Sequence, residues 1–269
     1  MTQAAETLVG TAEVEQFAAQ GATVLRGVFK DWVEPLREGT ARLMADPSPL
    51  ERSYTPKDGS ARFFQDLCNW QRIAEFRAFV EQSPAAALAA QLMKSRTARF
   101  FHDHILVKEP GTSIVTPWHQ DLPYYCVGGS QTVSLWIPLD PVARATSLEC
   151  VGGSHLWGRN YKPMRFDGTE LYQGDSSTPM PDIDADRSAF DILGWDVEPG
   201  DAVAFNFGTA HGAPGNASGT RRRVFSARWV GDDAYFVDRG GKGSPPFRHL
   251  TLKTGEPLDG PDFPLVYRA

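Results

Sequence analysis

The chain has 269 residues, of which 41% are hydrophobic and 22% charged, so it can bury a sizeable core like an ordinary globular protein. With 27 basic and 33 acidic residues, its net charge of −6 offers no basic surplus for a nucleic-acid backbone or an anionic membrane surface. No apolar run approaches the ~18 residues of a membrane span, and three cysteines without a CxxC pair argue against a disulfide framework and suit a reducing cytoplasm.

The first part of the chain, to about residue 97, is predicted to be mainly helical. Helices are expected over residues 11–20 and 31–45, separated by a short β-type run that ends near Gly27. Residues 71–94 predict two further helices, because Ser83-Pro84 interrupts an otherwise helical pattern. Little β structure is expected here.

From about residue 98 the pattern changes to short strands joined by Gly/Pro turns. Residues 131–139 have the period of two that is typical of a strand: apolar Val133, Leu135 and Ile137 fall on one face, and the residues between them fall on the other. Residues 158–192 are polar and rich in Pro, Gly, Asp and Ser, which predicts a long excursion that covers or shapes a binding site. The other strands are predicted at 98–108, 147–151, 221–230 and, around a turn at Pro199-Gly200-Asp201, within 194–207.

This order of elements favours a mainly β fold with flanking helices. Strands that follow a helical set suggest an antiparallel barrel or sandwich with helices on one side. No βαβ alternation or GxGxxG motif supports a nucleotide-binding sheet. No linker separates the parts, so we expect one domain over 1–269, with a helical part to about 97, a β core over about 98–230 and a tail over 231–269.

A metal site is indicated by Trp118-His119-Gln120-Asp121. On an extended segment, side chains two apart point to the same side, so His119 and Asp121 can converge on one ion. His211 supplies a third ligand from the predicted turn 208–212. Two histidines and one carboxylate form the facial triad that leaves positions open on non-haem iron. The H-x-D pattern alone is weak, because it also occurs in surface loops.

An arginine after the distal histidine adds to this site. Arg222 lies eleven residues past His211 and shares one strand face with Ser226 and Arg228. If that face points inward, Arg222 is a buried guanidinium that requires a carboxylate. Alternation then places Arg221 and Arg223 on the outside.

The ordered set of motifs resembles the phytanoyl-CoA dioxygenase family, over about residues 12–230. The resemblance implies a double-stranded β-helix, the cupin-like jelly roll, with N-terminal helices packed on one sheet. It also implies that His119, Asp121 and His211 bind Fe(II), that Arg222 binds 2-oxoglutarate, and that Trp136 lies against this cosubstrate. The motifs are WHQD, GGSHLWG, the PGD turn, HG followed by Arg222, and the early QFAAQGATVLRGVF.

The chain departs from the family pattern beside the cosubstrate. Many relatives carry a serine two residues after the distal histidine, where this chain has Ala213. Ser226 or Ser134 is expected to supply the hydroxyl instead. The resemblance also implies cosubstrate or substrate contacts on the strand before the H-x-D pair, where His104 lies. Tyr124, just after the pair, and Arg228 are further predicted pocket residues.

The activity that this resemblance implies is oxidation of a small organic molecule with Fe(II), 2-oxoglutarate and O₂, releasing succinate and CO₂. Halogenating relatives have a small residue in place of the carboxylate, so Asp121 favours hydroxylation or desaturation. Two alternatives stay open: another non-haem metalloenzyme on a cupin barrel without 2-oxoglutarate, and an inactive jelly roll that only binds a small molecule. The substrate and a choice between monomer and homodimer are not encoded in any motif.

Overall fold

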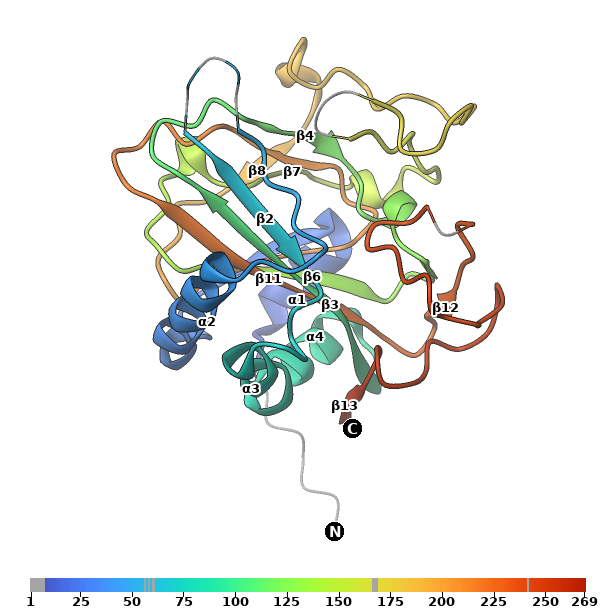
Figure 1. Ribbon diagram of the computed structural model, residues 1–269. Helices are drawn as coiled ribbons and strands as arrows, with labels where there is room; N and C mark the ends of the chain where they lie inside the picture. The colour runs from blue at the N-terminus through green and yellow to red at the C-terminus, as the bar shows by residue number, and fades with distance from the viewer. Residues whose placement is uncertain (1–7, 56, 58, 60, 166–168, 241) are drawn as a thin grey trace.

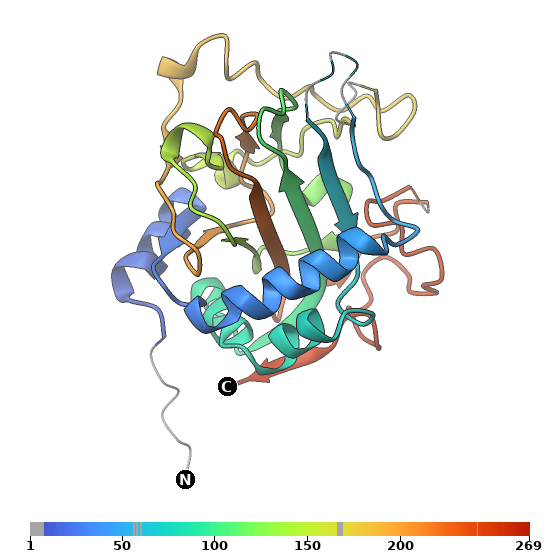
Figure 2. The same cartoon turned by 60° about the vertical axis from the view of Figure 1, so that its left-hand side comes forward.

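Figure 1 shows the computed structural model of the chain, which describes residues 8–55, 57, 59, 61–165, 169–240 and 242–269. Antiparallel sheets make up its centre. The helices gather on one side of the sheets, away from the excursion of residues 169–192, and Figure 2 gives a second view of this separation. None of the helices in the described part of the chain has the length and apolar character needed to cross a bilayer.

The predicted helices are confirmed. Gly21, with a φ of 73°, adopts the left-handed conformation that ends the first helix, which favours glycine because a Cβ would be strained there. Pro84 is the residue just before the last helix, as expected from the break at Ser83-Pro84. The α-helices are α1 (Thr11–Gln20), α2 (Val33–Ala45), α3 (Ala74–Gln82) and α4 (Ala85–Met93). Short 3-10 helices are η1 (Lys30–Trp32), η2 (Leu122–Tyr124), η3 (Arg144–Thr146), η4 (Ser154–Leu156) and η5 (Arg187–Ala189).

The larger sheet has the strand order β1-β9-β6-β11-β3-β13, and β2 pairs with β3 beside β13. The expected strands at 98–108, 131–139 and 221–230 are confirmed, but β2 lies in the part that was expected to have little β structure. Its pairing with β3 explains why a local pattern did not indicate it. The strands are β1 (Ala22–Leu25), β2 (Phe63–Leu67), β3 (Thr97–Lys108), β6 (Thr132–Pro138), β9 (Ala202–Phe205), β11 (Arg222–Val230) and β13 (Leu265–Arg268).

The smaller sheet has the order β4-β10-β7-β8 and differs from the sequence prediction in two places. His211 begins a strand rather than lying in a turn. The segment 195–198, before the predicted turn, is not a strand; β8 precedes it, and Val197 forms only an isolated bridge to Val142. Its strands are β4 (Thr116–His119), β7 (Glu149–Val151), β8 (Ile192–Gly194) and β10 (His211–Ala213), while β5 (Val127–Gly128) and β12 (Tyr235–Phe236) form a separate pair.

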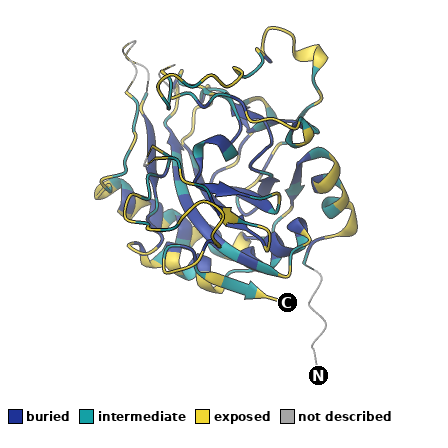
Figure 3. Cartoon of the chain, turned by 90° about the vertical axis from the view of Figure 1, so that its right-hand side faces the viewer, coloured by how far each residue is buried: buried dark blue, intermediate teal, exposed yellow. Residues whose placement is uncertain are grey.

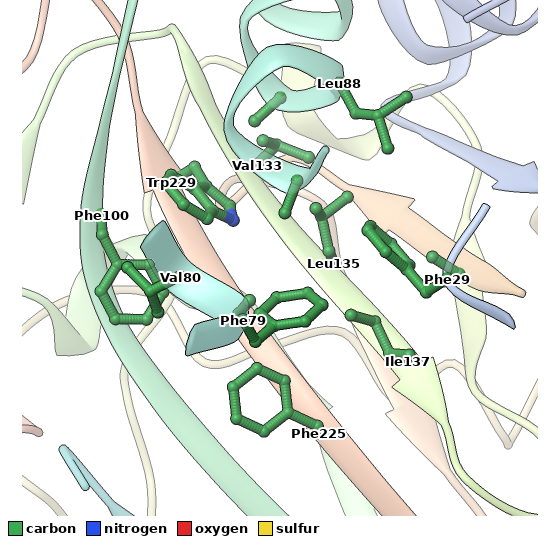
Figure 4. Close-up of a cluster of buried hydrophobic side chains, with 14 of the residues drawn as sticks. Phe29, Phe79, Val80, Leu88, Phe100, Val133, Leu135, Ile137, Phe225 and Trp229 are labelled. Carbon is green, nitrogen blue, oxygen red and sulfur yellow. The ribbon is translucent and has the colours of Figure 1, made fainter. Parts of the chain in front are cut away.

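The outer face of the larger sheet and the helices enclose the main core. Val133, Leu135 and Ile137 of β6 pack here, as the alternation predicted. Phe225 of β11 contacts Phe79 of α3, with ring centroids 5.0 Å apart, and Figure 4 shows these side chains together. Burial of apolar area is worth roughly 25 cal/mol per Å², so this layer is the main source of stability.

The C-terminal segment is packed against the sheets. β13 pairs with the first residues of β3, and Phe236, Leu258 and Phe263 join a cluster around Phe101. Figure 3 shows that the buried residues concentrate in the sheets, while exposed residues lie mostly on the surrounding loops. The segment thereby adds the last strand, β13, to the larger sheet.

Candidate metal centre and cosubstrate pocket

His119, Asp121 and His211 come together between the sheets. Each offers one ligand atom, and these atoms all lie within 4.8 Å of one another. The two histidines meet because His119 at the end of β4 pairs directly with His211 at the start of β10. Their Nε2 atoms lie 3.7 and 3.9 Å from Asp121 Oδ1. The predicted set of metal ligands is therefore brought into one place.

Backbone carbonyls orient both imidazoles. His119 Nδ1 lies 2.7 Å from the Pro117 carbonyl oxygen, and His211 Nδ1 lies 2.9 Å from that of Thr209. Such a contact fixes the proton on Nδ1 and leaves the Nε2 lone pair free for a metal. Burial lowers the pKa of His211 to about 3, with His119 as the next cause, so this imidazole is neutral at ordinary pH.

Asp121 divides its two carboxylate oxygens between two tasks. Oδ1 faces the histidines, whereas Oδ2 accepts a hydrogen bond from Ser134 at 3.2 Å and lies 3.5 Å from Arg228 Nε. Burial alone would raise the pKa of Asp121, but Arg228 and the two histidines hold it well below its usual value. The side chain is thus an ionised, oriented ligand.

The structure differs from the sequence prediction in the setting of Asp121 and adds a contact for Ser134. Asp121 is not on an extended segment: it follows β4 in a helical conformation as the residue before η2. Ser134, one of the two serines considered for the cosubstrate, donates its hydroxyl to Asp121 and is not among the residues that line the cavity described below. Ser134 therefore acts on the metal ligand.

Gln120 fixes the two ligand segments relative to one another. Its amide donates to the Gly208 carbonyl at 2.8 Å and accepts from the Tyr161 N–H at 3.0 Å. Leu122 N–H adds a bond to the Phe207 carbonyl at 2.9 Å. The H-x-D pattern gave no reason to single out its middle residue, because this role depends on a segment almost ninety residues away.

A cavity of about 510 Å³ opens beside the three ligands. Segment 158–192, which was expected to shape the binding site, contributes Met164 and Leu171. Segment 52–70 contributes Tyr54, Phe63 and Gln65. Predicted residues that line it are His104, Tyr124, Trp136, Arg222, Ser226 and Arg228. The ligands thus lie at a cavity large enough for more than one small molecule.

Arg222 is buried and faces the cavity, as the alternation predicted. Arg221 and Arg223 point outward and pair with Glu109 and Asp140. Arg222 donates to the Thr146 carbonyl, and within the described residues it has no carboxylate partner. Burial lowers its pKa to about 10. A buried cation without an acid is a ready partner for an anionic ligand.

Ser226 also faces the cavity without a partner. Its hydroxyl is buried and makes no hydrogen bond among the described residues. A buried hydroxyl normally has a partner, so Ser226 and Arg222 together fit the carboxylate of a bound cosubstrate. Trp136 lines the same region and provides an apolar wall.

The three residues expected near a substrate also have contacts within the protein. His104 Nε2 lies 3.1 Å from Gln65 Oε1. The Tyr124 hydroxyl donates to the Met164 carbonyl and accepts from its N–H, at 2.6 and 2.8 Å, so it anchors the excursion at the cavity. Arg228 donates to the Tyr125 hydroxyl in addition to its contact with Asp121.

The sequence prediction missed Lys108. This lysine at the end of β3 is 1% exposed and lines the cavity, with Nζ 4.8 Å from the ring centre of Phe63. It pairs in register with Arg222 of β11. The alternation of β3 could have signalled it, because His104 and Lys108 fall on the same face.

Comparison with known proteins gives the following results. A model of the phytanoyl-CoA dioxygenase (PhyH) family matches residues 17–224. No curated protein matches the sequence.

Solved structures with the same architecture include several that use 2-oxoglutarate. The carbocyclase SnoK from nogalamycin biosynthesis has a TM-score of 0.76 at 22% identity, covering 96% of both chains. The epimerase SnoN, solved with Fe³⁺, α-ketoglutarate and nogalamycin RO, has a TM-score of 0.71 at 21% identity. The match covers 95% of this chain and 97% of the SnoN chain. EctD from S. alaskensis, solved with 2-oxoglutarate and 5-hydroxyectoine, has a TM-score of 0.65 at 16% identity. The match covers 85% of this chain and 78% of the EctD chain. The predicted jelly-roll fold is confirmed.

Proposed function

The chain belongs to the phytanoyl-CoA dioxygenase family of Fe(II)- and 2-oxoglutarate-dependent oxygenases, and we propose that it hydroxylates an unactivated C–H bond of a small organic substrate. Succinate and CO₂ are the products from 2-oxoglutarate. One observation carries the proposal: three metal-ligand atoms lie within 4.8 Å of one another beside a cavity that also contains the buried cation Arg222.

We assign the residues as follows. His119, Asp121 and His211 hold Fe(II), and their donor set suits a metal that keeps open positions. When bound, the iron and 2-oxoglutarate supply the oxidising chemistry. Arg222 holds the distal carboxylate of 2-oxoglutarate through charge-assisted hydrogen bonds. Trp136 excludes water from one side of the cosubstrate, and Ser226 donates a hydrogen bond to it.

The state of Asp121 supports hydroxylation over halogenation. Its carboxylate fills the third ligand position, and its second oxygen is held by Ser134 and Arg228. A halide would need that position. His104 and Tyr124 also line the cavity and are assigned to the substrate side.

The test is anaerobic addition of Fe(II) and then 2-oxoglutarate to the metal-free protein, followed by O₂. We expect a weak visible charge-transfer band, and succinate after O₂ is admitted. Absence of both would favour a scaffold that only binds small molecules. Product analysis with candidate substrates then tests hydroxylation, and a ring closure or epimerisation, as the names of SnoK and SnoN describe, would replace it.

The setting of the enzyme is also proposed. The chain acts as a single oxygenase domain, as a monomer or homodimer, in the cytoplasm. Support for the cytoplasm comes from Cys68, Cys126 and Cys150, all of which are free thiols. Size-exclusion chromatography with light scattering tests the oligomeric state.

A further inference from the structure

Cations far outnumber acids in the lining of the cavity. Seven lysine and arginine side chains line it, and Asp121 is the single carboxylate among the described residues that do so. The chain as a whole has the opposite balance, with a net charge of −6. A cleft lined by one sign of charge raises the local concentration of ligands of the other sign. The imbalance therefore points to an anionic ligand.

The metal and the cosubstrate leave this imbalance in place. Three of the seven cations are buried: Lys108, Arg222 and Arg228. Arg222 is assigned to 2-oxoglutarate, and Arg228 Nε lies 3.5 Å from Asp121 Oδ2. Fe(II) and the 2-oxoglutarate dianion carry equal and opposite charges, so together they add no net charge to the cavity. The four remaining cations need another explanation.

These four, which we call the mouth cations, lie where the cavity meets the solvent. Arg52, Arg165, Lys242 and Arg248 are exposed although they line the cavity. They come from three separate parts of the chain: the segment before β2, the excursion that follows η4, and the C-terminal segment after β12. Folding therefore gathers like charges from distant segments around one opening, against their mutual repulsion.

No acid of the described residues forms an ion pair with a mouth cation. The carboxylates that lie near them in sequence have other partners: Glu51 pairs with Arg62, and Glu170 pairs with Lys162. The guanidinium of Arg165 instead donates to backbone carbonyls of residues 170 and 171, which holds it at the cavity. The charge at the mouth is thus available to a ligand.

A buried amide deeper in the cavity points to a ligand oxygen. Gln65 of β2 is 3% exposed and lines the cavity, and its Oε1 lies 3.1 Å from His104 Nε2. Its amide nitrogen is buried and has no hydrogen-bond partner among the described residues. Buried donors normally have a partner. The walls beside it include the aromatic side chains of Tyr54, Phe63 and Tyr124, which suit an apolar body.

We propose that the molecule oxidised is a small organic anion, a carboxylate or a phosphate ester, whose charged group is held by the mouth cations while its apolar body extends past Gln65 toward the metal. The inference rests on the proposed function and names its substrate class. The competing explanation is that the mouth cations are ordinary solvated surface charges.

Probes that share one ring system and differ in charge separate these explanations: 2-naphthoate, 2-naphthyl phosphate and the uncharged 2-naphthamide. Anaerobic titration calorimetry measures their dissociation constants on enzyme saturated with Fe(II) and 2-oxoglutarate, so that the cosubstrate already occupies Arg222. The test variant is Arg165→Gln/Arg248→Gln. The matched control, Arg77→Gln/Arg96→Gln, loses the same charge at exposed positions that do not line the cavity.

Charge-assisted hydrogen bonds should make at least one of the two anions bind about 10- to 100-fold more tightly than 2-naphthamide. The test variant should lose most of this preference, and the control should keep it. Added salt should weaken the preference in wild type, because exposed charges are screened. Affinity for 2-oxoglutarate should be the same in all three proteins.

Equal affinities for the three probes, or no binding of either anion, would overturn the inference. A preference that persists in the test variant would do the same, because it would place the anion away from the mouth. The two proposals also fail differently. A wild-type protein that gives no charge-transfer band with 2-oxoglutarate overturns the proposed function and this substrate class with it. A normal band without a preference for anions overturns only the substrate class.

Discussion

The two faces of the larger sheet are built from the same strands and are both buried, yet they differ in chemistry. On the outer face, β11 contributes Phe225 and Trp229 to the core under the helices. On the inner face, the same strand presents Arg222, Ser226 and Arg228 to the cavity. Strand alternation alone makes this division, because successive side chains point to opposite sides.

The difference separates stability from function. Apolar side chains on the outer face gain free energy by leaving water, whereas buried polar groups cost free energy unless they have partners. Among the described residues, the inner face contains Arg222, which has no carboxylate partner, and the Ser226 hydroxyl, which has no hydrogen-bond partner. Its residues therefore become stabilising only when metal and cosubstrate bind. Substitutions on the two faces should change different measured quantities.

The largest effect is expected from His211→Ala. Removal of one of three ligands should abolish Fe(II) retention and reduce 2-oxoglutarate-dependent succinate formation to background. The melting temperature of the metal-free protein should not fall, because His211 adds no apolar packing to the outer core. Iron analysis, succinate assay and calorimetry measure these quantities. His249→Ala, at an exposed position paired with Asp262, should leave all of them unchanged; equal iron retention in both variants would contradict the ligand assignment.

The outer face should respond in the opposite way. Phe225→Ala removes ring contacts with Phe76 and Phe79, at 4.9 and 5.0 Å, and should lower the free energy of unfolding by about 3–5 kcal/mol. The affinity of the folded fraction for 2-oxoglutarate should be unaffected. Denaturant titration measures the free energy of unfolding, and ligand titration measures the affinity for 2-oxoglutarate. A large affinity loss with little loss of stability would break the comparison.

Two serines of the inner face should separate metal from cosubstrate. Ser134→Ala removes a hydrogen bond to Asp121, so we expect Fe(II) affinity to fall by roughly 10-fold, the low end for partners of metal ligands. Ser226→Ala should leave Fe(II) affinity unchanged and weaken 2-oxoglutarate instead. Competition with a chelator and the charge-transfer titration distinguish them. The same pattern in both variants would show that the serines act only through packing.

The smallest effect is a pH dependence of cosubstrate affinity. Burial, and then Arg222, lower the pKa of Lys108 to about 6. The groups that face it are Arg222 from β11, the Phe63 ring from β2 and the carbonyls of residues 213–214, with no acid among them.

The direction follows from these contacts. A bound carboxylate favours the protonated amine, so binding takes up a proton and affinity must fall as pH rises above about 6. Between pH 6.5 and 7.5 we expect up to about an eightfold loss in wild type and a flat profile in Lys108→Met. Titrations at several pH values measure this. If the affinity of Lys108→Met fell with pH as steeply as that of wild type, a group other than Lys108 would be responsible for the pH dependence.

Much of this division could be predicted from local sequence patterns. Alternation placed Val133 and Leu135 on one face and Arg222 on the other, and the structure has them so. Contacts between distant segments could not be predicted. β2 becomes a strand by pairing with β3, Ser134 meets Asp121 through the closure of the two sheets, and Lys108, at the end of a strand, looks like a solvated charge until that strand is known to be interior.

The most direct test of the account is a diffraction experiment on crystals soaked anaerobically with Fe(II) and 2-oxoglutarate, with anomalous data at the iron edge. The account predicts an anomalous peak bound by His119 Nε2, Asp121 Oδ1 and His211 Nε2, and the distal carboxylate of 2-oxoglutarate against Arg222. Iron bound elsewhere, or a cosubstrate whose distal carboxylate points away from Arg222, would contradict it.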